Sequence, residues 1–310
     1  MSDIISVIMP VYNGAEHLDF SIRSLLSQTY PHWELLIVDD GSTDSTPDII
    51  ANWAEKDSRI RFFQQKNAGV SSARNLALAH CRGQYVTMLD ADDALIPEAM
   101  ELLIREIQQD DNIDLVTCGY SEITPSISQV VHRGGLLMGR KENGRMPCDD
   151  GFLAEYAHCS IWGKLLKTEL IRQRTLQFKP GMKVGEDHLF FLQYLQHCRQ
   201  AVVLQQELYH YMHWSVSAIS KYEKGEHSLD TYINSVLLFC SVSQTVNQKW
   251  APALLSHFFR VSQWVRKIIL SHRPGDWPRV RKAIYKALPS LLYRAGLIGS
   301  LRMFRRWYLR

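Results

Sequence analysis

Short apolar runs alternate with helix-like segments along the first 118 residues, and this order constrains the fold more than any other feature of the chain. Apolar runs bounded by turn residues are typical of strands buried on both faces of a parallel sheet. We expect such strands at residues 4–9, 34–38, 60–63, 85–89 and 113–118. Helical spacing and start signals predict helices near Leu18, from Thr46 as the N-cap, and over residues 71–81 and 97–108. The alternation predicts an α/β fold with a mostly parallel central sheet.

The composition is that of an ordinary globular protein with a large core, because 46% of its 310 residues are apolar and 22% are charged. The six cysteines stand eleven or more residues apart and form no CxxC pair, so we expect reduced thiols and a cytoplasmic location. The N-terminal segment lacks the basic residues of a signal peptide. No apolar run reaches the length of a membrane-spanning helix.

Three polar clusters follow predicted strands at the point where each strand ends. They are PVYNG (10–14), DDGSTD (39–44) and DADD (90–93). Ligands of open α/β sheets bind at the carboxyl ends of the strands, so we expect these clusters to form a binding site. The crowded carboxylates of the third cluster suit a divalent cation that also binds phosphates, although a solvated turn would have the same composition.

Five blocks occur in an order and at distances that resemble family 2 of the glycosyltransferases, the inverting nucleotide-sugar enzymes of GT-A fold. The blocks are SVIMPVYNG (6–14), ELLIVDDGSTDST (34–46), NAGVSSARNLAL (67–78), YVTMLDADD (85–93) and GEDHLF (185–190). IWGKLLKTELI (161–171) is similar to a block of bacterial members that build surface polysaccharides. The resemblance covers residues 4–220.

The resemblance implies a GT-A catalytic domain over residues 1–222. Its Rossmann-like, nucleotide-binding half would span residues 1–118 and its acceptor-side half residues 119–222. A basic, aromatic-rich helical region would follow at residues 223–310.

The resemblance also assigns residues to the nucleotide, namely Pro10, Val11, Tyr12, Asp39, Asp40, Arg74 and Asp90. Tyr12 would stack on the base, and Asp40 would accept a hydrogen bond from the uracil N–H. Asp39 more plausibly stabilises the turn before Gly41. Arg74 would meet the nucleotide or its phosphates, and Asn75 would cap or brace the loop.

The resemblance assigns metal binding and catalysis to the acidic blocks. Asp92 would be the principal ligand of Mn²⁺ or Mg²⁺, while Asp90 would contact the ribose, or the metal through water, and Asp93 would support them. Inversion requires a base that deprotonates the acceptor hydroxyl, and the resemblance makes this Asp187. Glu186 would orient Asp187 or touch the acceptor.

Two further side chains are candidates on the acceptor and diphosphate sides. Trp162 would form an acceptor-side wall, because sugars stack on aromatic rings, or it would belong to the core. His213 lies near the position at which family members have a cation that contacts the diphosphate, or it would be a third metal ligand.

The charge of the chain is uneven. Residues 249–310 hold 14 Lys and Arg against one acid, a net +13, and residues 1–248 hold 21 against 31, a net −10. Interleaved basic and aromatic residues indicate peripheral contact with an anionic membrane leaflet, or a helical subdomain packed on the core. We expect no nucleic-acid partner.

The sequence therefore predicts a metal-dependent inverting hexosyl- or N-acetylhexosaminyltransferase. It would move a sugar from UDP to a hydroxyl of a bacterial glycan or lipid-linked glycan, with a β-linkage as the product. One alternative is a non-catalytic nucleotide-sugar binding module, which would have no use for the acid pair at 186–187. The other is a nucleotidyltransferase, but PVYNGAEHLD (10–19) has no basic residue to hold a triphosphate.

Overall fold

The computed structural model describes residues 3–125, 129–133, 144–148, 152, 160–182, 185–214, 263, 266–267, 269–271 and 274–282. The chain divides into two compact units. The first comprises residues 1–148, 159–181 and 197–214, and the second comprises residues 149–158, 182–196 and 215–310. The boundary predicted at residue 222 lies outside the described residues.

The first unit is built on one sheet, whose described strands number ten. Four parallel strands form one half: β1 (Ile5–Val11), β2 (Trp33–Asp39), β3 (Ile60–Gln64) and β4 (Tyr85–Met88). The antiparallel β9 (Lys164–Lys167) joins β4 to β6 (Ile113–Thr124), which runs parallel to β10 (Gln200–Met212). The main path is β3-β2-β1-β4-β9-β6-β10-β5.

Three short strands complete the sheet at its margins. They are β5 (Ala94–Leu95) and β8 (Gly144–Pro147), both antiparallel to β10, and β7 (Gln129–Arg133), antiparallel to β6. The prediction of an α/β fold with a mostly parallel central sheet is confirmed.

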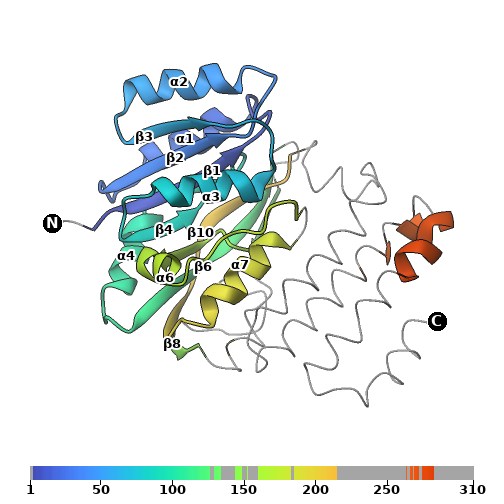
Figure 1. Ribbon diagram of the computed structural model, residues 1–310. Coiled ribbons are helices and arrows are strands. Elements are labelled where there is room, and N and C mark those ends of the chain that lie inside the picture. Colours follow the sequence, from blue (N-terminus) through green and yellow to red (C-terminus); the bar gives the residue numbers. More distant parts are fainter. Residues whose placement is uncertain are drawn as a thin grey trace, which may run out of the picture. The chain divides into compact units, whose positions relative to one another are not determined.

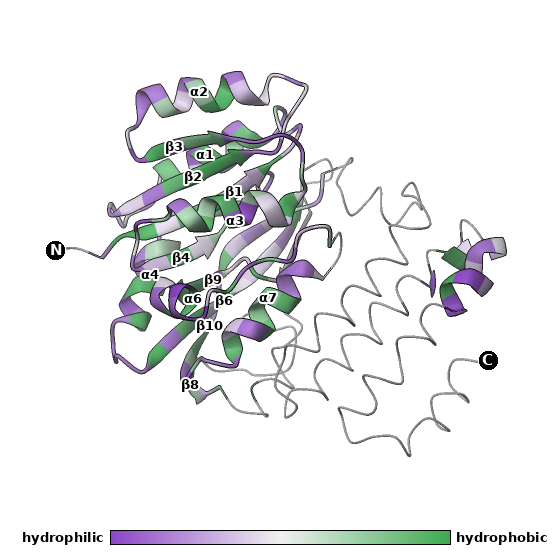
Figure 2. Cartoon of the chain, in the orientation of Figure 1, coloured by the Kyte–Doolittle hydropathy of each residue, from purple (hydrophilic) through white to green (hydrophobic). Residues whose placement is uncertain are grey.

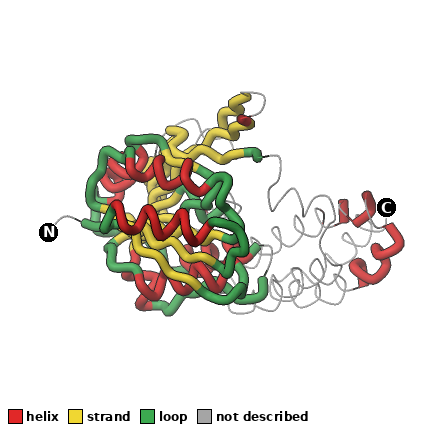
Figure 3. The backbone as a smooth tube through the Cα atoms, turned by 90° about the horizontal axis from the view of Figure 1, so that it is seen from above, coloured by secondary structure: helices red, strands yellow, loops and turns green. Residues whose placement is uncertain are grey.

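Helices cover both faces of this sheet, as the views along and across the strands show (Figures 1 and 3). The helices of the first unit are α1 (Leu18–Leu26), α2 (Thr46–Lys56), α3 (Val70–His80), α4 (Ala99–Ile107) and α6 (Thr168–Gln173). Side chains of a strand alternate between the two faces, so a strand covered on both sides must be apolar at nearly every position. In β1, Val7 and Met9 belong to the core cluster with α1 and α4, and Ile8 between them is equally buried. The strands are accordingly mostly hydrophobic in Figure 2.

One predicted helix start is wrong by a residue. Ser45 precedes α2, and Thr46 is its first helical residue. The Thr46 hydroxyl accepts a hydrogen bond from the Gly14 amide at 2.9 Å and donates one to Asp44 Oδ1 at 2.6 Å. The hydroxyl is therefore committed to a contact between two loops, which sequence spacing does not reveal.

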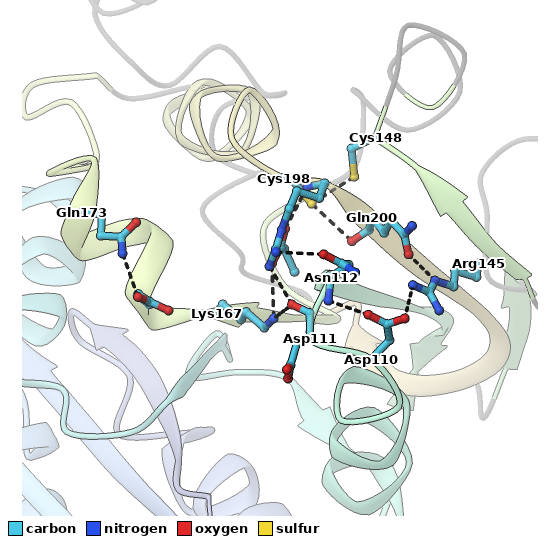
Figure 4. A network of polar contacts seen from close by, with 12 residues as sticks. Asp110, Asp111, Asn112, Arg145, Cys148, Lys167, Gln173, Cys198 and Gln200 are labelled. Atoms are coloured by element: carbon cyan, nitrogen blue, oxygen red, sulfur yellow. Dashed lines mark hydrogen bonds and ion pairs between the residues drawn. The ribbon is translucent and has the colours of Figure 1, made fainter.

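A charged network joins β6, β9 and β10 where β6 begins, at the edge opposite the carboxyl ends of the parallel strands (Figure 4). Asp114 is fully buried and accepts hydrogen bonds from the Arg199 amide and from the Arg199 guanidinium at 2.7–2.9 Å. Lys167 Nζ lies 3.3 Å from Asp114 Oδ1 and donates to the Asp111 carbonyl. Burial alone would raise the pKa of Asp114, but these cationic partners outweigh it and hold the pKa below its usual value.

In the second unit, the structure describes α7 (Glu186–Leu195) and helical residues between 263 and 282, including the short 3-10 helix η4 (Pro274–Asp276). Most of the basic segment 249–310 lies outside the described residues. Within the described part of the chain, none of the helices combines the length and the apolar character that crossing a membrane requires.

Candidate active site

The loops after β1 and β2 are bound to each other at the carboxyl edge of the sheet. The Asn13 amide donates to Ser42 Oγ at 2.8 Å, and Asn13 Oδ1 accepts from the Thr43 amide at 2.8 Å. Asn13 has a positive φ of 51°, which Asn tolerates better than most residues. Tyr12, directly before this turn, is 52% exposed. The ring predicted to stack on the base therefore precedes a turn that is fixed by hydrogen bonds, and about half of its surface is exposed to solvent. Of the two residues before it, Pro10 is partly buried and Val11 is buried.

Asp39 shapes the turn after β2. Its Oδ1 accepts a hydrogen bond from the Ser42 amide at 3.0 Å, and its Oδ2 accepts one from Gln64 Nε2 at 3.0 Å. Gly41 within the turn has φ +77°, and a Cβ there would lie 2.8 Å from the Asn67 amide nitrogen. The bond to Ser42 is the turn contact expected of Asp39, and its assignment to the nucleotide stays a prediction.

Asp40 holds the loop that precedes α3. Its Oδ1 accepts from Gln65 Nε2 at 2.7 Å and from the Ala68 amide at 2.8 Å, and its Oδ2 accepts from the Gly69 amide at 2.8 Å. This anchoring role was not anticipated from the sequence, because the three donors come from a separate loop. Its predicted hydrogen bond to uracil stays a prediction.

Arg74 and Asn75 project from the first turns of α3. Arg74 is 5% exposed; its Nη2 donates to Asp90 Oδ1 at 3.2 Å, and its guanidinium lies 5.2 Å from the centre of the Phe178 ring. Asn75 Nδ2 donates to the Phe178 carbonyl and Asn75 Oδ1 accepts from the Phe178 amide, both at 2.8 Å. The predicted bracing role of Asn75 is confirmed, and the loop it braces is the one at Phe178.

The acidic turn after β4 crowds three carboxyl groups, of which Asp90 is paired with Arg74. Burial, and then the negative charge of Asp90, raise the pKa of Asp92 to about 6. Burial and the charges of Asp90 and Asp92 also raise the pKa of Asp93. Among the described residues only its own backbone amide is hydrogen-bonded to the Asp92 carboxylate, whereas Asp93 is bonded to β10. Asp92 thus has the character of a ligand for a positive charge.

The donor set of this turn fits a hard divalent cation that also binds phosphates. Carboxylate oxygens are ligands that Mg²⁺ and Mn²⁺ accept, and Mg²⁺ is commonly held by one or two carboxylates with substrate phosphates and water. Among the residues described, no group of three or more His, Cys, Asp or Glu side chains could hold a metal ion by itself. Carboxylates such as those of this turn could hold such a cation together with phosphate oxygens and water.

The two candidates on the acceptor and diphosphate sides lie near β10. Trp162 is partly buried and stacks on Tyr209, with 4.5 Å between ring centres and 13° between planes. His213 directly follows β10, is 47% exposed at its side chain, and has Nε2 3.5 Å from Glu122 Oε2. The stacking on Tyr209 favours a core contact for at least one face of Trp162. The role of His213 stays a prediction.

The predicted base lies at the start of α7, in the second unit. Gly185 precedes the helix with φ 82°, a conformation that favours glycine. Asp187 Oδ1 accepts from the His188 amide at 2.8 Å and lies 3.2 Å from His188 Nδ1. Glu186 and Asp187 occupy the first turn, where the helix dipole stabilises carboxylates. The roles of both acids stay predictions.

Comparison with known proteins gives consistent results. The family model for glycosyl transferase family 2 matches residues 6–161. Glycosyltransferase GlyA of Streptococcus pneumoniae is 32% identical over 217 residues, 68% of this chain and 31% of GlyA. The uncharacterised glycosyltransferase EpsJ of Bacillus subtilis is 29% identical over 218 residues, 68% of this chain and 61% of EpsJ. The chain thus spans less than two thirds of the length of either relative.

A solved structure shows the same fold. The crystal structure of S. aureus TarS residues 1–349 in complex with UDP-GlcNAc superposes with a TM-score of 0.68, over 96% of this chain and 91% of that one, at 20% identity. The fold is therefore of the GT-A type. Because the family model covers residues 6–161, half of the chain, and includes the loops after β1, β2 and β4, the chain belongs to glycosyl transferase family 2.

Proposed function

We propose that this protein is a metal-dependent inverting glycosyltransferase that moves a sugar from UDP to a hydroxyl of a bacterial glycan or lipid-linked glycan. The observation that carries the proposal is the contact between Arg74 and Asp90, with Nη2 and Oδ1 3.2 Å apart. It joins a buried guanidinium to the acidic turn that contains Asp92. A diphosphate that accumulates negative charge during transfer needs positive charge around it, and this arrangement can supply it from the arginine and a bound cation.

The nucleotide would bind across the carboxyl edge of β1 and β2. The exposed ring of Tyr12 is available to stack on the base, and Asp40 is the acceptor assigned to the uracil N–H. The UDP-GlcNAc complex of TarS, which shares the fold, supports a UDP donor.

Asp92 would hold the cation, and Asp90 would contact the ribose, or the cation through water. When bound, Mn²⁺ or Mg²⁺ would neutralise the charge that develops on the leaving UDP. Burial and the charge of Asp90 raise the pKa of Asp92, and a bound cation would offset both effects by favouring the ionised form.

Asp187 would act as the general base. It would take the proton from the acceptor hydroxyl while that oxygen attacks the anomeric carbon, and the bond to UDP would break with its electron pair leaving on the phosphate. Attack opposite the leaving group inverts the anomeric centre, so an α-linked donor would give a β-linked product. Glu186 would orient Asp187.

The proposal is tested by incubating the full chain with a panel of nucleotide sugars and measuring nucleotide release with Mn²⁺, Mg²⁺ or EDTA. We expect slow release of UDP from at least one UDP-sugar, with either metal but not with EDTA. If UDP-sugars bind and no release occurs with any donor or acceptor mixture, the chain is a binding module instead.

A further inference from the structure

The third acid of the DADD cluster is more deeply buried than the other two. Asp93 is 1% exposed and its carboxylate points into the fold. The Tyr209 hydroxyl donates to Asp93 Oδ2 at 2.6 Å, and the Met212 amide donates to Asp93 Oδ1 at 2.8 Å. Both partners belong to β10, so this carboxylate connects the acidic turn to a strand more than a hundred residues away.

Further contacts tie the same turn to the end of β10. The Asp90 amide donates to the Tyr209 hydroxyl oxygen at 3.4 Å, and Trp214 Nε1 donates to the Asp92 carbonyl at 2.8 Å. Directly after Asp93, β5 pairs with β10 in the register Tyr209↔Leu95. The backbone of Asp90, the carbonyl of Asp92 and the carboxylate of Asp93 are thus all bonded to one segment.

That segment is itself held firmly by aromatic contacts. The Tyr209 ring is fully buried, and Trp162 stacks on it at 4.5 Å. Trp214 stacks on His17 with 3.9 Å between ring centres and 11° between planes. Each ring that bonds to the acidic turn is therefore packed against a second ring.

We propose that Asp93 is a positioning residue. Through Tyr209 and Met212 it fixes the Asp90–Asp92 turn so that the two carboxylates are held ready for a divalent cation and the diphosphate it carries. The physical reason is that like charges repel, so a turn crowded with carboxylates relaxes outwards unless other bonds hold it. A site already held in its binding geometry loses little further conformational entropy when the ligand binds. This inference rests on the function proposed above.

Three variants test the connection at separate atoms. Asp93→Asn removes the carboxylate, and Tyr209→Phe removes only the hydroxyl. Trp214→Phe removes the donor to the Asp92 carbonyl and also makes the ring that stacks on His17 smaller. Tyr209→Phe is decisive because it removes no acidic group from the turn. A weaker cation affinity in this variant therefore reports lost geometry and not lost charge.

The matched control is Asp114→Asn. Asp114 is also a fully buried carboxylate, and its hydrogen bonds come from Arg199, directly before β10. It lies at the opposite edge of the sheet from the acidic turn. This control should lower the melting temperature and leave cation binding unchanged.

The readouts are Mn²⁺ affinity by electron paramagnetic resonance, with and without UDP, and the melting temperature. We expect Tyr209→Phe and Asp93→Asn to weaken Mn²⁺ binding in the presence of UDP by about tenfold or more, and Trp214→Phe by less. Because Tyr209 and Asp93 share a hydrogen bond, the loss of Mn²⁺ affinity in the double variant should be smaller than the sum of the two single losses.

Two failures remain distinguishable. If the unaltered chain binds neither UDP nor Mn²⁺ with UDP, the proposed function fails and this inference fails with it. If the unaltered chain binds both, and Tyr209→Phe and Asp93→Asn bind Mn²⁺ equally well while only their melting temperatures fall, Asp93 is a structural residue and the positioning role is wrong.

Discussion

The Tyr209 hydroxyl donates a 2.6 Å hydrogen bond to the Asp93 carboxylate, across 116 positions of the chain. The bond connects the turn after β4 to the final residues of β10. Because Asp90 and Asp92 lie in the same turn, the acidic cluster is part of the sheet edge and not a free surface loop. That connection affects how the site should respond to substitution.

Substitution of Asp187 by Asn should remove transfer and preserve donor binding. An amide cannot accept the hydroxyl proton, so we expect the transfer rate to fall by about 10²–10⁴-fold. The dissociation constant of the UDP-sugar, measured by calorimetry, should change little. Asp276→Asn, an acid of the same unit outside the predicted site, serves as the control. Transfer by Asp187→Asn at near the original rate would exclude Asp187 as the base.

Substitution of Asp92 by Ala should weaken metal-dependent donor binding. The variant loses the only assigned direct metal ligand, so we expect Mn²⁺ affinity in the presence of UDP to fall by at least about tenfold. Electron paramagnetic resonance of free Mn²⁺ measures this directly. Asp111→Asn, an exposed acid at the other edge of the sheet, should bind Mn²⁺ as the unaltered chain does. Unchanged Mn²⁺ affinity in Asp92→Ala would remove Asp92 from the metal site.

Substitution of Tyr12 by Ala should weaken UDP binding without lowering stability. The ring is half exposed, so its removal costs the fold little, whereas loss of a base-stacking ring costs about 1–3 kcal/mol of binding. Tyr12→Phe keeps the ring and should restore most of the affinity. Calorimetric titration with UDP and a melting curve together check both halves of the prediction. Equal UDP affinity in all three proteins would show that the ring does not stack on the base.

Substitution of Asp114 by Asn should lower the free energy of unfolding at neutral pH. The loss should be smaller at acidic pH. The folded-state pKa of Asp114 is depressed, so its ionised form stabilises the fold above the unfolded-state pKa near 3.8, and this contribution is lost as the pH falls through the folded-state pKa. We expect a loss of about 1–3 kcal/mol at pH 7, since charge-assisted hydrogen bonds from Arg199 are weakened. Urea unfolding at several pH values measures the difference, which should narrow below about pH 4. A constant difference across this range would mean that the charge of Asp114 does not contribute.

The pattern of apolar residues along the chain was sufficient to predict most of the strands and helices of the first unit. The strands expected at 34–38 and 60–63 are β2 and β3 to within a residue or two, because a strand buried on both faces must be apolar throughout. The helix expected over 71–81 is α3, displaced by one residue. The prediction of Thr46 as the N-cap of α2 was wrong. The Thr46 hydroxyl is bonded to the Gly14 amide, 32 positions away, and sequence spacing does not predict such a partner.

The amino-acid sequence by itself determined the alternation of strands and helices, the edge of the sheet where the polar loops gather, and the family, since these depend on residue type and order along the chain. Only the tertiary structure decided what each carboxylate faces. Asp40 anchors the loop at Gln65–Gly69, Asp92 has only its own backbone amide as a described donor, and Asp93 is bonded to Tyr209 and Met212. The physical reason is that a carboxylate takes its role from the donors and charges around it, and here those donors come from segments up to 119 positions distant.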